Sequence, residues 1–167
     1  MRFLLMLCIL PGFIQVPQNV DISKIRGLYH SAPVVKQDAR QFYQLMLGVD
    51  SSAAAPVLIC YKGASEMIQA KYALNPIAKL DKFNKGKALL KKAISRDTLD
   101  LEMRFIRFSI QSNLPAFLGY HDELETDKRF LLDKTKDNKD PELKEIIYNY
   151  LSSLPIIKPE ELKQLKN

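Results

Sequence analysis

Apolar residues recur along most of the chain with the three-to-four-residue spacing of an amphipathic helix, and no stretch alternates convincingly with the two-residue period of a strand. Turns rich in Pro, Gly, Asn or Asp separate the periodic segments. This pattern predicts an all-α fold of antiparallel helical hairpins, an array of about seven helices. The predicted helices cover residues 22–30, 34–47, 53–74, 76–96, 99–112, 122–134 and 140–154, and Lys158–Pro159 predicts a short terminal helix.

Two of these helix starts have strong sequence signals. Asn75–Pro76 and Asp140–Pro141 each place a good N-cap residue before a proline at the first helical position. Gly63 and Gly86 fall inside helices, where we interpret them as marks of close helix contacts. The apolar side of the helix over 76–96 is predicted to consist of Ile77, Leu80, Phe83, Leu90 and Ile94.

The N-terminus has the pattern of a secretory signal peptide. Met1–Arg2 gives a cationic start, residues 3–10 are apolar, and Pro11–Gly12 breaks the run. The run is shorter than the ~20 residues of a membrane-spanning helix. We therefore expect residues 1–18 to be a signal peptide, residues 19–167 to be a single helical domain, and the mature protein to be periplasmic or secreted. The alternative is a buried N-terminal helix or strand, and the absence of a clean pair of small residues leaves the cleavage site open between residues 15 and 22.

Composition agrees with one soluble domain. The chain has 167 residues, of which 47% are hydrophobic and 26% charged, which excludes a disordered tail, a collagen-like chain and a polytopic membrane protein. Removal of the leader with Cys8 would leave Cys60 as a single thiol, and we expect it to be a small buried apolar residue.

Few residues are typical of catalysis. His30 and His121 lie in different loops, without a Cys or His nearby at metal-ligand spacing. His121–Asp122–Glu123 is interpreted as a capped helix start. There is neither a glycine-rich phosphate loop nor a Gly-x-Ser-x-Gly turn. The sequence thus predicts no enzymatic activity, no metal and no cofactor.

Two polar stripes on otherwise apolar helices are the main candidates for binding. Residues at spacings of three, four and seven share a helix face, as Asp100, Arg104 and Arg107 do. The first helices of successive hairpins line one concave surface in a helical array, so we expect Glu66 to lie within ion-pair reach of Arg104 or Arg107. This arrangement would form either a groove for a carboxylate, peptide or phosphate, or an ion pair that only fixes the helix register. The candidate groove residues are Tyr61, Lys62, Glu66, Gln69, Arg104, Arg107, Gln111, Asn113 and Tyr120.

Positive charge gathers on one helix of a chain whose formal net charge is +6. The lysines form either a solvated face or a surface attracted to an anionic membrane leaflet or polysaccharide. Nucleic acid is not an expected partner, because an exported protein leaves the compartment that holds nucleic acid. The basic stretch also lacks the interleaved aromatic residues that stack on bases. The lysines are Lys79, Lys82, Lys85, Lys87, Lys91 and Lys92.

Residues 89–108 resemble the junction between tetratricopeptide repeats: Ala93 takes the place of the small residue, whereas Thr98 replaces the usual Pro and Arg107–Phe108 the usual Leu-Gly. Residues 57–133 are also similar to a group of small exported bacterial proteins, mostly of unknown function. That resemblance is carried by residues 61–64 (Tyr-Lys-Gly-Ala), 75–76 (Asn-Pro), 104–108 (Arg-Phe-Ile-Arg-Phe) and 117–120 (Phe-Leu-Gly-Tyr). It implies tetratricopeptide-like hairpin packing and brings no activity with it.

These observations predict an exported, non-enzymatic binding or assembly module of the cell envelope, whose helical groove binds another envelope protein. The alternative is an accessory subunit or weak enzyme that binds an anionic small ligand through Arg104 and Arg107.

Overall fold

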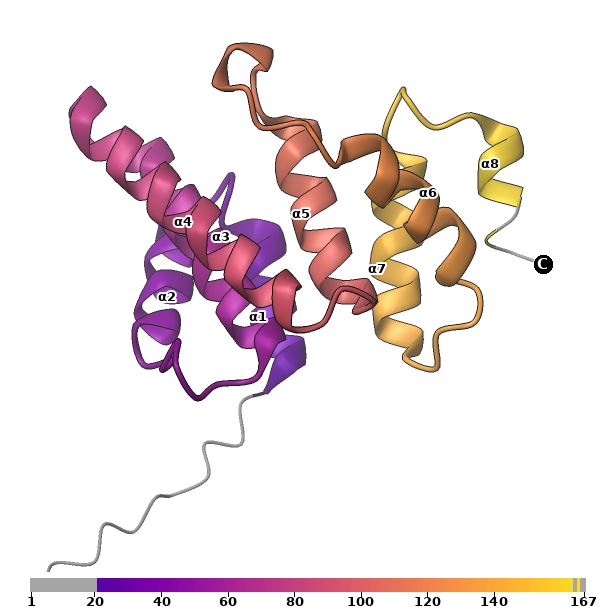
Figure 1. Ribbon diagram of the computed structural model, residues 1–167, viewed down its shortest axis with the longest axis horizontal. Helices are drawn as coiled ribbons and strands as arrows, with labels where there is room; N and C mark the ends of the chain where they lie inside the picture. The colour runs from indigo at the N-terminus through magenta and orange to yellow at the C-terminus, as the bar shows by residue number, and fades with distance from the viewer. Residues whose placement is uncertain (1–20, 164, 166–167) are drawn as a thin grey trace, which may run out of the picture.

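The computed structural model describes residues 21–163 and 165, and every regular element within them is a helix, which confirms the predicted all-α array (Figure 1). The predicted signal peptide, residues 1–18, lies outside the described residues. The α-helices are α1 (Ile22–Ser31), α2 (Lys36–Leu47), α3 (Pro56–Tyr72), α4 (Pro76–Arg96), α5 (Leu101–Asn113), α6 (Leu124–Lys134), α7 (Pro141–Ser152) and α8 (Pro159–Lys163), with a short 3-10 turn, η1 (Ala116–Leu118), between α5 and α6.

Helix α5 lies between two apolar clusters and belongs to both. Met103 and Ile106 pack into a first cluster formed by α1 to α5. Phe105 and Phe108 pack into a second cluster with α6, α7 and the C-terminal residues. Because α5 buries large side chains on two sides, it joins the halves of the molecule.

Helices α3 and α4 cross closely at two glycines. A Cβ atom on Gly63 would stand 2.8 Å from the carbonyl oxygen of Gly86, and one on Gly86 would stand 2.6 Å from that of Gly63. Distances this short exclude any side chain at the crossing, so the interpretation of both glycines as contact points is confirmed.

The caps explain where the helices begin. The side chains of Asn75 and Asp140 accept the backbone N–H of Ala78 and Leu143, as their sequences predicted. Helix α5 begins two residues later than expected, because the side chain of Asp100 caps it through Met103 N at 2.7 Å.

Three other predicted helix starts were early, and one of them is that of α2, which begins at Lys36 rather than at residue 34. Helix α6 begins at Leu124, where the side chain of Glu123 makes no cap hydrogen bond, so the capped start expected at residues 121–123 was wrong. Helix α3 begins at Pro56, because residues 51–54 form turns and a bend.

The first turns of α4 differ from the prediction. Leu90 and Ile94 are buried as expected, but Ile77 and Leu80 are exposed. Figure 1 shows the start of α4 projecting at one end of the molecule. The helix is 21 residues long, and its first turns extend beyond the helices that pack on its later part. Ile77 and Leu80 therefore stay largely exposed, although they continue the apolar spacing of α4.

Candidate functional site

A cavity of about 460 Å³ opens between the odd-numbered helices. Its lining comes from α1, α3, α5 and α7, which are the first helices of successive hairpins, and from the turn after α1. We call this cavity the groove. Its apolar lining includes Val34, Met67, Ile68, Ile110, Leu114 and Ile146.

The polar wall of the groove is built on a buried ion pair between α1 and α5. The Arg26 guanidinium donates from Nε and Nη2 to the two carboxylate oxygens of Glu102, both at 2.7 Å. Tyr61 of α3 donates its hydroxyl to the same carboxylate at 2.6 Å. A bidentate contact of this kind fixes the guanidinium in one orientation. Hydrogen bonding to Glu102 raises the pKa of Arg26 further, so it stays charged.

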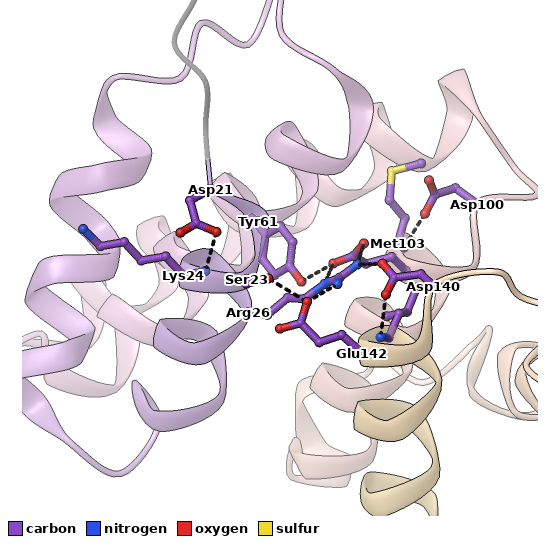
Figure 2. A network of polar contacts seen from close by, with 11 residues as sticks. Asp21, Ser23, Lys24, Arg26, Tyr61, Asp100, Met103, Asp140 and Glu142 are labelled. Atoms are coloured by element: carbon purple, nitrogen blue, oxygen red, sulfur yellow. Dashed lines mark hydrogen bonds and ion pairs between the residues drawn. The ribbon is translucent and has the colours of Figure 1, made fainter.

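Arg26 also reaches helix α7, as Figure 2 shows. Its Nη1 donates to Glu142 at 2.6 Å and its Nη2 to Asp140 at 2.8 Å, while the hydroxyl of Ser23 donates to Glu142. Both carboxylates lie at the positive end of the α7 dipole, which helps to balance the excess negative charge. We call these contacts of Ser23 and Arg26 with Asp140 and Glu142 the α1–α7 clasp.

The tyrosine hydroxyls of the wall are already paired. The Tyr29 hydroxyl lies 2.5 Å from that of Ser109, and the Tyr150 hydroxyl accepts from Asn113 at 2.6 Å. Burial raises the pKa values of both tyrosines, so neither hydroxyl is activated as a base or nucleophile. At the rim, Lys71 donates to the carbonyl of Pro33. The surface left for a ligand is therefore mainly apolar.

The predicted contact between Glu66 and the arginines of α5 was wrong. Glu66 is fully buried against α4, where Lys82 Nζ lies 2.7 Å from Oε2 and Lys85 Nζ lies 2.5 Å from Oε1. The reason is that the α3 face bearing Glu66 packs on its hairpin partner α4 rather than on α5.

Arg104 and Arg107 point to α6 instead of the groove. Arg104 Nη1 donates to Asp127 at 2.7 Å, and Arg107 donates to both oxygens of Asp127 from Nε at 2.6 Å and Nη2 at 2.8 Å. Asp127 is fully buried. The predicted stripe does share a face, but that face is covered by α6.

The other candidates divide in the same way. Of the nine predicted groove residues, Tyr61 and Asn113 line the groove. The remaining four side chains serve local packing: Lys62 donates to the carbonyl of Val49, Gln69 to that of Ala39, Gln111 to Glu123, and Tyr120 stacks edge-on against Phe83.

Sequence reasoning missed Arg26 and Glu102, although both carried a signal. Arg26 interrupts the apolar stripe Ile22, Ile25 and Tyr29, and a charge in such a stripe has to be paired if it is buried. Glu102 shares its helix face with Ser109 and Asn113, at i, i+7 and i+11, and this is the groove face of α5.

Within residues 21–163 and 165, no group of three or more His, Cys, Asp or Glu side chains could hold a metal ion, and no helix is long and apolar enough to cross a membrane. Cys60 is fully buried, as predicted, and burial raises the pKa of its thiol well above the ordinary value.

The sequence matches no family model, and neither the curated proteins nor the solved structures give a match. We therefore base the function on the geometry of the groove.

Proposed function

We propose that the protein is an exported, non-enzymatic binding or assembly module of the cell envelope, and that its groove binds an apolar segment of a partner protein. The observation that carries this proposal is the groove itself, lined by four successive first helices whose Tyr29, Tyr61 and Tyr150 hydroxyls are already hydrogen-bonded within the protein. A surface of this kind accepts apolar side chains from an amphipathic helix or an extended segment.

The rim of the groove favours a macromolecular occupant. Val34 lines the groove and is 80% exposed, so the apolar surface continues outward onto the turn after α1. Ile68 and Ile146, on α3 and α7, are partly exposed on the same lining. A segment of a partner can cover these residues while its own apolar side chains fill the interior.

No specific observation favours the alternative, an anionic small ligand held by Arg104 and Arg107. Both guanidinium groups are paired with Asp127, so an anion would have to displace a buried carboxylate of the chain itself.

Two adjacent valines provide a matched test of groove binding. Val34→Glu places a charge on the groove rim, whereas Val35→Glu places one on an exposed neighbour outside the groove lining. We expect Val34→Glu to reduce capture of a partner from envelope extract by tenfold or more, with Val35→Glu close to wild type and both variants melting normally. Equal capture by the two variants would overturn the proposal.

Export is tested separately. The mature protein is expected outside the cytoplasm, with its N-terminus between residues 15 and 22. Cell fractionation followed by N-terminal sequencing measures both. An intact Met1 on protein from the cytosolic fraction would contradict the predicted export and leave the groove proposal to its own test.

A further inference from the structure

The tip of the α3–α4 hairpin exposes three large apolar side chains within seven residues. Leu74 is 101% exposed, Ile77 83% and Leu80 57%. Ile77 and Leu80 are three residues apart and share the outer face of α4. Single exposed apolar residues are common, but a cluster at a projecting end marks an interaction surface. We call Leu74, Ile77 and Leu80 the hairpin tip.

A fourth exposed apolar residue, the aromatic Phe117, lies in the loop between α5 and α6. Phe117 of η1 is 85% exposed, and in Figure 1 the start of α4 and the loop that carries η1 both lie along the upper edge of the view, with the start of α4 at its left end. The loop is attached to α4 three residues later, where the Tyr120 ring packs edge-on against Phe83, one turn after Leu80.

Helix α4 also carries the net charge of the protein. The chain has 25 basic and 19 acidic side chains, and α4 contains seven of the basic and one of the acidic ones. The rest of the chain is therefore balanced, with 18 of each. Lys82 and Lys85 are turned inward to Glu66, but Lys79, Lys91 and Lys92 are exposed, and their ammonium groups make no hydrogen bond or ion pair within residues 21–163 and 165.

We propose that the hairpin tip and the exposed lysines of α4 form a docking surface for an anionic lipid bilayer. Apolar side chains at a free helix end, with basic side chains along the same helix, are the combination by which proteins bind the bilayer interface without crossing it. The apolar tip enters the headgroup region, and the lysines pair with anionic headgroups.

Charge argues against a second copy of the chain as the occupant. A symmetric dimer through this face would place two α4 helices, each with a net charge of +6, against one another. An anionic bilayer instead complements the charge and also accepts apolar side chains.

The chain lacks Trp, so a single introduced Trp reports its own surroundings. We compare Ile77→Trp with Leu99→Trp, since Leu99 is also exposed but lies at the other end of α4. With vesicles of phosphatidylglycerol and phosphatidylcholine, the emission of Ile77→Trp is expected to shift to shorter wavelength and to be quenched by brominated acyl chains. Leu99→Trp should show neither effect. Residues 1–18 are common to both variants, so a difference between them comes from the hairpin tip.

The charge is tested by vesicle sedimentation of the triple variant Lys79→Gln/Lys91→Gln/Lys92→Gln. Each basic side chain near an anionic surface contributes roughly fivefold to binding, so the partition coefficient should fall on the order of 100-fold. The control, Lys24→Gln/Lys139→Gln/Lys163→Gln, removes three exposed lysines from other elements and should bind nearly as the parent does. Val34→Glu should also bind vesicles normally, which separates this proposal from groove binding.

Three outcomes would overturn the proposal. The first is identical emission from Ile77→Trp and Leu99→Trp in the presence of vesicles. The second is an equal loss of binding in the two lysine variants. The third is a shift of Ile77→Trp that needs no lipid and grows with protein concentration, since it would identify a second copy as the occupant.

Discussion

At the scale of single residues, the groove wall depends on a buried arginine and its carboxylate. Arg26 and Glu102 are both buried, and Tyr61 satisfies a further lone pair of Glu102. Removing one member of a buried pair leaves an uncompensated charge, which costs about 3–5 kcal/mol, whereas replacing both by apolar groups is often nearly neutral.

We therefore expect Arg26→Met, which leaves the buried Glu102 carboxylate without a cation, to lower the free energy of unfolding by about 3–5 kcal/mol, and Arg26→Met/Glu102→Leu to restore much of it. Urea unfolding of the two single variants and the double variant, read as a double-mutant cycle, measures the coupling. Additive effects would show that the pair contributes no coupling energy. Arg129→Gln, which loses only an exposed ion pair with Glu125, is the control and should change little.

The second buried carboxylate predicts a dependence on pH. Burial alone would raise the pKa of Glu66, but hydrogen bonds and charge from Lys82 and Lys85 outweigh it and hold that pKa below 4.5. A carboxylate with a lowered folded-state pKa stabilises the protein above its unfolded pKa, and this stability is lost as the pH falls through the folded-state value.

Wild type should thus be more stable than Glu66→Gln at pH 7, and the difference should shrink as the pH falls below about 4.5. Chemical unfolding at several pH values from 7 to 3 measures this difference. Glu125→Gln, at an exposed site, should give a small difference at every pH. A Glu66→Gln difference that stays constant across the range would contradict the assignment.

The sequence singled out Glu66, Arg104 and Arg107 but not their partners, and it missed the pair of Arg26 and Glu102 altogether. The stripe of Arg104 and Arg107 does lie on one helix face, because helical spacing alone determines that. Their partner Asp127 could not be identified, because the face of α5 that α6 covers depends on the path of the loop from residue 114 to 123.

At the scale of elements, helix bounds were more predictable than helix faces. Asn75 and Asp140 fix the starts of α4 and α7 through local hydrogen bonds that are visible in sequence. Helix α5 buries apolar residues toward two clusters, so its period does not indicate one inward side. The apolar period also predicted that Ile77 and Leu80 are buried, but the first turns of α4 extend beyond the helices that pack on the rest of it, and both side chains are exposed.

The α3–α4 crossing gives a prediction at this scale. Gly63→Ala would place Cβ 2.8 Å from the carbonyl oxygen of Gly86 and 2.4 Å from Leu90 Cδ1, so the helices must separate, and a loss of about 1–3 kcal/mol is expected. Gly27→Ala is the control, because its Cβ would meet no heavy atom within 4 Å apart from its sequence neighbours and the nearby backbone of α1, and α1 should gain about 0.5–1 kcal/mol. Thermal unfolding measures both. Equal effects of the two substitutions would mean that the crossing is not tightly packed.

At the scale of the whole molecule, the chain departs from a simple array. In such arrays each hairpin contacts only its neighbours, and the ends are independent. Here Arg26 of α1 bonds to Glu142 and Asp140 of α7, 116 and 114 positions away in the sequence. The order of the hairpins predicted a concave groove lined by the first helices. It did not predict the contact between α1 and α7, because that contact depends on how much the array curves over its whole length.

The α1–α7 clasp should therefore control how α7 is held against the rest of the molecule. Asp140→Asn/Glu142→Gln removes the two partly exposed carboxylates, keeps an N-cap residue on α7, and leaves Arg26 paired with Glu102. Because these ion pairs are partly solvated, a global loss of about 1 kcal/mol or less is expected. Native-state hydrogen exchange should nonetheless show faster exchange of the α7 amides, with those of α3 nearly unchanged. Uniform acceleration in α3 and α7, or none in α7, would show that the apolar cluster of Leu143, Ile147 and Leu151 holds α7 without the clasp.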